Sequence, residues 1–184
     1  MSKTMTDILK LAETEKFEFQ DQVQDRETSV SPEAALSLRV WLRLLTCSNL
    51  IERDIRSRLV RDLDITLPQF DVLAQLERGF NGMTMSQLSQ RMMVTNGNVT
   101  GLVDRLEKEG LVQREADPDD RRSNRVSLTP AGRARFNEMV PIHHGWLEDM
   151  MNGLDKETID QLYENLDSLK GSILEANNKA STRI

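Results

Sequence analysis

The 184-residue sequence contains a single cysteine, Cys47, and no long apolar segment. A lone cysteine excludes an internal disulfide framework and is typical of proteins kept in a reducing compartment. No stretch approaches the roughly 20 apolar residues that a membrane-spanning helix requires. Residues 1–7 also lack the basic and then apolar layout of a secretion signal. The sequence therefore predicts a cytoplasmic protein with no membrane partner.

The motifs of common enzyme classes are lacking as well. No phosphate-binding loop, nucleophile elbow or metal-ligand framework stands in a suitable context. The two histidines, His143 and His144, make a metal site conceivable together with Glu148, one helical turn beyond His144. Without the usual Cys/His spacing, a packed or solvated histidine is the better interpretation. We therefore expect neither an enzyme nor a cofactor.

The net charge of −6 would, taken alone, argue against a nucleic-acid partner. The charge is unevenly distributed, however. Residues 1–36 carry a net charge of −4 and residues 136–184 carry −5, whereas residues 37–83 and 84–135 carry +1 and +2. Because the acidity lies at the two ends, the middle of the chain remains compatible with DNA.

Helical periodicity begins after a polar N-terminal arm of residues 1–30. Ser31 and Pro32 are typical of a helix start, and the apolar stripe that follows them predicts a helix to about Leu63. At about 1.5 Å per residue this helix is roughly 45 Å long, which is more than a small core needs, so we expect part of it to pack on a second subunit. Cys47 lies on the stripe, and we expect its side chain to be buried.

The rest of the chain predicts a mainly α fold with a small β-hairpin. Helices are expected to begin near Thr66, Thr84 and Thr95, and the last of these ends at Gly110. Alternation then predicts strands at 111–115 and 125–128, and two long helices follow. We expect a single domain of residues 31–184, with a winged helix at about 66–128 between dimerisation helices at about 31–63 and 129–175.

Two short helices joined by a tight turn and followed by a charged hairpin are typical of a winged helix-turn-helix. The helix after Thr95 presents short hydrogen-bonding side chains at its N-terminal end, where the helix also carries partial positive charge. Within it, Gly97 and Gly101 each cost about 1 kcal/mol relative to alanine, which indicates close approach by DNA or by a neighbouring helix.

The loop of the hairpin carries three arginines, and arginine in a narrow minor groove is a recurrent device of DNA recognition. Asp120 is placed to hold Arg122 by an ion pair. A solvated loop balanced by its own aspartates is the alternative, which the preceding helix-turn-helix pattern disfavours. The candidate DNA contacts are Thr84, Ser86, Thr95, Asn96, Asn98, Thr100, Arg105, Asp120, Arg121, Arg122 and Arg125.

Four segments resemble the MarR family of winged-helix transcription regulators: MSQLS at 85–89, VTGLVDRLEKEGLV at 99–112, DRR at 120–122 and VSLTPAG at 126–132. The resemblance covers roughly residues 34–174. It implies a homodimer on a palindromic operator in double-stranded DNA, with an effector site where the dimerisation and DNA-binding regions meet. It also implies that Asp120 and Arg122 form the wing pair, and that Asn96, Asn98 and Thr100 face the groove.

Residues 91–101 are similar to a subgroup that controls the catabolism of aromatic acids and includes sensors of coenzyme A thioesters. This similarity implies a repressor that is released when a small aromatic acid or its CoA thioester favours a spacing of the recognition helices unsuited to DNA. Candidate effector contacts are aromatic and cationic side chains: Arg39, Trp41, Arg43, Phe70, His143 and Trp146. Core or dimer packing and surface salt bridges are the alternative roles.

Two other functions remain open at this point. A thiol-based oxidative-stress sensor would act through Cys47. A winged-helix protein-interaction module without DNA binding would fit the acidic total and the few basic residues of the recognition helix. Salt-dependent affinity for DNA separates this module from a regulator.

Overall fold

The computed structural model describes residues 35–79, 82–92, 96–117 and 124–181. The polar arm of residues 1–30, Thr95 and the loop residues Asp120, Arg121 and Arg122 lie outside the described residues. The chain divides into two compact units, Met1–Ser57 and Arg58–Ile184. The single domain expected for residues 31–184 stays a prediction.

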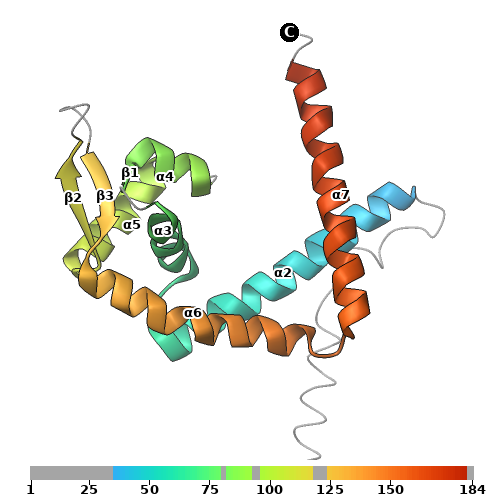
Figure 1. The fold of residues 1–184 in the computed structure, drawn as a ribbon, viewed down its shortest axis with the longest axis horizontal. Coiled ribbons are helices and arrows are strands. Elements are labelled where there is room, and N and C mark those ends of the chain that lie inside the picture. Colours follow the sequence, from blue (N-terminus) through green and yellow to red (C-terminus); the bar gives the residue numbers. More distant parts are fainter. Residues whose placement is uncertain (1–34, 80–81, 93–95, 118–123, 182–184) are drawn as a thin grey trace, which may run out of the picture. The chain divides into compact units, whose positions relative to one another are not determined.

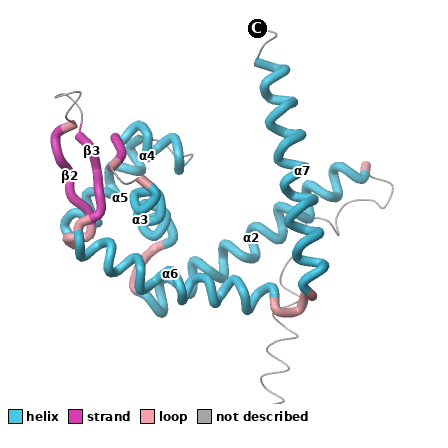
Figure 2. The backbone as a smooth tube through the Cα atoms, viewed as in Figure 1, coloured by secondary structure: helices cyan, strands magenta, loops and turns pink. Residues whose placement is uncertain are grey.

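The fold is mainly α with a small antiparallel sheet, as the sequence predicts (Figures 1 and 2). The elements in chain order are α2 (Leu36–Leu63), α3 (Leu67–Arg78), β1 (Met83–Thr84), α4 (Met85–Met92), α5 (Asn96–Lys108), β2 (Val112–Ala116), β3 (Asn124–Leu128), α6 (Pro130–Met151) and α7 (Lys156–Ser181).

The sheet has three strands in the order β1-β3-β2, so the predicted two-stranded hairpin was incomplete. Strand β1 pairs antiparallel with β3, with Met83 opposite Val126 and Thr84 opposite Arg125. Two residues are too few to show the alternation from which a strand is recognised in a sequence. The missed strand joins the start of α4 to the sheet.

Polar side chains fix where the helices begin. The Thr84 hydroxyl accepts from the Gln87 amide at 3.2 Å, and the Gln87 side chain accepts from the Thr84 amide at 3.0 Å, which is a reciprocal capping box. Asp155 caps α7 by accepting from the Thr158 amide at 2.8 Å. Hydrogen bonding by Asp155 to Thr158 also lowers the pKa of this aspartate. The cap at Thr84 confirms the helix start that the sequence predicts there.

The core of the second unit is built from α3, α4, α5, β3 and α6. Its fully buried side chains include Leu73, Leu76, Leu88, Val99, Val103, Leu106, Val126 and Met139. Leu59 and Leu63, at the C-terminal end of α2, are also buried. This core holds the two short helices α4 and α5 against the sheet.

In the first unit, α2 carries an apolar stripe that is largely exposed. Trp41 is 47% exposed and Val40 is 44% exposed. The side chain of Cys47 is exposed as well, so the expectation that it is buried was wrong. The physical reason is length, because the stripe of this 28-residue helix extends well beyond its buried side chains, such as Ile55. Among the described residues, no helix is long and apolar enough to cross a bilayer.

The start of α6 packs against Leu111, the residue that precedes β2. Thr129 caps the helix by accepting from the Gly132 amide at 2.9 Å, and its own amide donates to the Leu111 carbonyl at 3.1 Å. A Cβ atom on Gly132 would lie only 1.8 Å from that Leu111 oxygen. A side chain at this position would therefore force α6 away from the strand.

We expect Gly132→Ala to lower the free energy of unfolding by about 3 kcal/mol, because the added methyl group overlaps backbone atoms that cannot move independently. Chemical denaturation of the full-length protein measures this loss. Ala131→Ser, at the exposed neighbouring position, is the control and should change the stability by less than about 0.5 kcal/mol. Equal stabilities of the two variants would contradict the close packing at Gly132.

Candidate nucleic-acid interface

Helix α5 has one face buried in the core and one face exposed. Val99, Val103 and Leu106 are fully buried and fix the rotation of the helix on the core. The predicted contacts Asn98 and Thr100 are exposed near the N-terminal end, and Arg105 is exposed in the last turn. Asn96 is the first residue of the helix, and its side chain lies outside the described residues. The exposed face is thus polar at its N-terminal end, where side chains could hydrogen-bond base edges in a major groove.

Gly97 and Gly101 both face open space. A Cβ atom built on either glycine meets no heavy atom of another described element within 4 Å. Packing against a neighbouring helix of the described chain therefore does not account for these glycines. Approach of a DNA backbone or base edge to these glycines stays a prediction.

Helix α4 contributes polar groups beside this face. Ser86 is exposed in its first turn, whereas the Thr84 hydroxyl is engaged in capping α4. A hollow of about 460 Å³ lies next to β1, and Arg91 and Gln90 of α4 contribute to its lining. Arg91 is a basic group that the sequence interpretation missed, although a cation in the last turn of this short helix was a visible signal.

Arg125 does not lie at the tip of the hairpin. It is part of β3, and its Nε donates to Asp117 Oδ2 at 2.9 Å. The Asp117 side chain is only 5% exposed, so the ion pair is largely shielded from water and joins the ends of the two strands. The expected gathering of three arginines at the tip is therefore wrong for Arg125, which reinforces the base of the loop.

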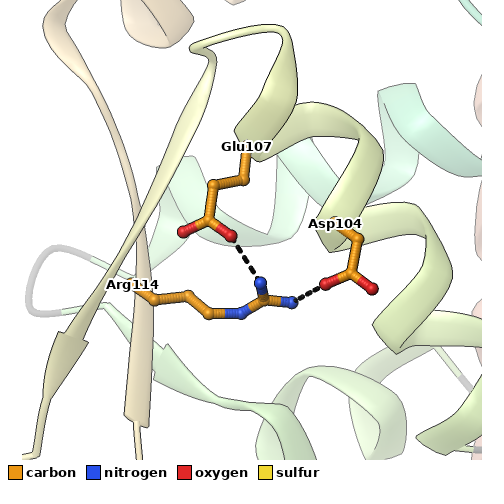
Figure 3. A network of polar contacts seen from close by, with 3 residues as sticks. All are labelled: Asp104, Glu107 and Arg114. Atoms are coloured by element: carbon orange, nitrogen blue, oxygen red, sulfur yellow. Dashed lines mark hydrogen bonds and ion pairs between the residues drawn. The ribbon is translucent and has the colours of Figure 1, made fainter.

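Acidic side chains of α5 are turned toward the hairpin rather than toward the outward face. Arg114 of β2 donates to Asp104 Oδ1 and to Glu107 Oε2, each at 2.5 Å (Figure 3). The arginine side chain is 23% exposed. The two ion pairs offset negative charge that would otherwise repel phosphate groups near the recognition helix. Arg114 is a second functional candidate that the sequence interpretation missed.

Three of the six candidate effector contacts come together in the second unit. The rings of Phe70 and His143 stack with centroids 4.8 Å apart and planes inclined by 28°, and Trp146 lies 6.4 Å from His143. Burial, with a smaller contribution from the nearby His144, lowers the pKa of His143. The protein environment therefore favours the neutral imidazole.

The other three candidates, Arg39, Trp41 and Arg43, belong to α2 in the first unit. Their part in an effector site stays a prediction. The aromatic cluster of Phe70, His143 and Trp146 lies between α3 and α6, two helices that also contribute to the core under the recognition helix.

A helix-turn-helix followed by a β-hairpin, with a polar helix face directed outward, defines the class of winged-helix DNA-binding proteins. The family model described as "MarR family" matches residues 65–123. An "Uncharacterized HTH-type transcriptional regulator" of Bacillus cereus is 30% identical over 129 residues, which cover 68% of this chain and 82% of that relative. The chain belongs to the MarR family of transcriptional regulators.

Other relatives agree with this assignment. The "Transcriptional activatory protein BadR" of Rhodopseudomonas palustris is 37% identical over 100 residues, 53% of this chain and 57% of that protein. A MarR family regulator from Silicibacter pomeroyi has a solved structure with a TM-score of 0.66 and 29% identity, covering 78% of this chain and 99% of that one. The structure of a mutant of MarR from E. coli has a TM-score of 0.64 and 26% sequence identity, covering 76% of this chain and 98% of that one.

We expect Gly101→Ala to stabilise the protein and to weaken its binding to DNA. Alanine gains about 1 kcal/mol of helix propensity at a position with open space around it. The same methyl group stands between α5 and the groove, so we expect about tenfold weaker binding. Chemical denaturation and a salt titration of DNA affinity measure the two effects.

Gly145→Ala in α6 is the matched control, because a Cβ atom there also meets nothing within 4 Å. It should give a similar gain in stability and leave DNA affinity unchanged. Equal DNA affinities of the wild type and Gly101→Ala would show that the glycine is not at the interface.

Proposed function

We propose that the protein is a homodimeric repressor, which binds a palindromic operator and is released by a small aromatic acid or its CoA thioester. The observation that carries this proposal is the outward face of α5. At the N-terminal end of this face the exposed groups are the uncharged hydrogen-bonding side chains Asn98 and Thr100 and two glycines with open space around them. This face suits base edges and phosphates.

The exposed apolar side chains of α7 support a dimer. Leu162, Leu166, Leu169 and Ile173 follow one another at steps of four, three and four residues, and each is between 36% and 51% exposed. This spacing places them on one face of the helix. A continuous apolar face exposed to water favours association, since each Å² of apolar surface removed from water contributes roughly 25 cal/mol.

The aromatic cluster of Phe70, His143 and Trp146 supports an aromatic effector. Stacked rings offer faces and edges that fit a further ring, and the neutral imidazole of His143 can exchange a hydrogen bond with a carboxyl or carbonyl group. A ligand that binds here releases DNA only if it prefers the form of the dimer that does not fit the operator.

The exposure of Cys47 favours one alternative, an oxidative-stress sensor. In that case a peroxide would release DNA from the wild type and not from Cys47→Ser. Aromatic acids would then have no effect on either protein.

The full-length protein is expected to run as a dimer in sizing experiments and to enrich a palindromic duplex from a random-sequence pool. Its affinity for that duplex should fall steeply with salt, because phosphate contacts release counterions. A reporter gene placed behind the duplex should be silenced by the protein, as expected of a repressor. A monomer that enriches no duplex would contradict the proposal, and activation of the reporter would replace the repressor with an activator.

We expect His143→Gln to reduce release of the selected duplex by aromatic acids or their CoA thioesters about tenfold, because the ring that stacks on Phe70 is lost. Binding to DNA without a ligand should stay unchanged. His144→Gln is the control, since His144 is 69% exposed on the same helix. Equal loss of release in both variants, or in neither, would place the effector elsewhere.

A further inference from the structure

We propose that Arg114 is a positioning residue for DNA recognition, which holds the wing (strands β2 and β3) at a fixed angle to recognition helix α5. The proposal rests on the proposed operator binding and goes beyond it, because it assigns the geometry of the complex to a residue that need not touch DNA.

The two carboxylates that hold Arg114 come from one face of α5. Asp104 and Glu107 are three residues apart, so they lie one turn above each other beside the buried Val103 and Leu106. The Arg114 guanidinium donates to each of them through a different terminal nitrogen, at 2.5 Å in both cases (Figure 3). A planar fork held at two points is fixed in orientation as well as in distance.

On the strand, Arg114 continues the face that packs on the core. Val112 of β2 is 2% exposed, and alternation places Arg114 on the same side of the sheet. Arg114 lies opposite Val126, which is fully buried, whereas Glu115 and Ala116 are exposed. On this face of the wing, the two ion pairs of Arg114 join β2 to α5.

The angle of the wing matters because the wing acts as a lever. Strand β2 continues beyond Arg114 to Ala116, so a tilt at Arg114 changes the direction in which the strand leaves the core. Beyond the pairing of β1 with Val126 and Arg125 the wing has only two strands. A two-stranded ribbon is only marginally stable by itself, so its direction depends on contacts at its base.

The test uses the full-length protein and the duplex that the wild type enriches from a random-sequence pool. We expect Arg114→Gln to bind this duplex at least about tenfold more weakly. At saturating protein it should also lose hydroxyl-radical protection of the minor groove beside each half-site, while protection at the centre of each half-site persists. A purely structural role would weaken binding without this selective loss.

Arg133→Gln is the matched control. It removes another ion pair between two elements, since Arg133 Nη1 of α6 lies 2.5 Å from Glu77 Oε2 of α3. We expect its affinity to stay within about twofold of the wild type, with the whole footprint retained. Arg114→Lys keeps the charge and loses the fork, so it should recover part of the affinity and leave the flanking protection reduced.

Two further variants keep the proposal testable if Arg114→Gln does not fold. Asp104→Asn and Glu107→Gln each leave one ion pair in place, and each should lose part of the flanking protection. The proposal is overturned if the flanking protection persists in Arg114→Gln or, where that variant does not fold, in Asp104→Asn and Glu107→Gln. It is also overturned if Arg133→Gln loses as much flanking protection as Arg114→Gln, or if Arg114→Lys restores this protection fully. A wild type that enriches no duplex refutes the proposed function itself, and this result is seen before any variant is compared.

Discussion

The burial of Val99, Val103 and Leu106 is the interaction on which the DNA-binding surface depends. Each fully buried aliphatic side chain contributes about 2 kcal/mol to stability. Turning this face of α5 away from the core would therefore cost an amount comparable to the whole free energy of unfolding of a small domain. The rotation of the helix is therefore fixed. This rotation also fixes which polar side chains point outward, and it directs Asp104 and Glu107 toward Arg114.

The elements of the fold could be predicted from the sequence because their signals are local. Caps such as Thr84 and Asp155 act within one turn, and the buried positions of α5 recur at helical spacing. Strand β1 could not be recognised, because only its pairing with β3 makes it a strand. Burial of Cys47 was inferred from a stripe, and a stripe shows which side of a helix is apolar without showing where the core ends.

The candidate site was predictable in part for the same reason. The outward face of α5 follows from periodicity, whereas the clamp on Arg114 joins residues seven and ten positions apart through the turn from helix to strand. In the sequence, Asp104 and Glu107 lie on either side of the candidate DNA contact Arg105, and nothing there shows that they contact Arg114. In the structure both carboxylates form ion pairs with Arg114 of the wing, so their negative charge is offset there (Figure 3).

The same logic bears on how an effector would act. Phe70 lies in the first turn of α3, whose buried side chains Leu73 and Leu76 support the recognition helix, and His143 lies on α6. Packed cores resist continuous deformation, so a ligand between the two rings would move α6 against α3 more readily than it would deform α3. Because α6 leads into α7 through only four residues, 152–155, such a movement passes directly to the exposed apolar face proposed as the dimer interface. The proposed effector would then change the spacing of two intact recognition units, and the Arg114 clamp would keep each unit rigid while it moves.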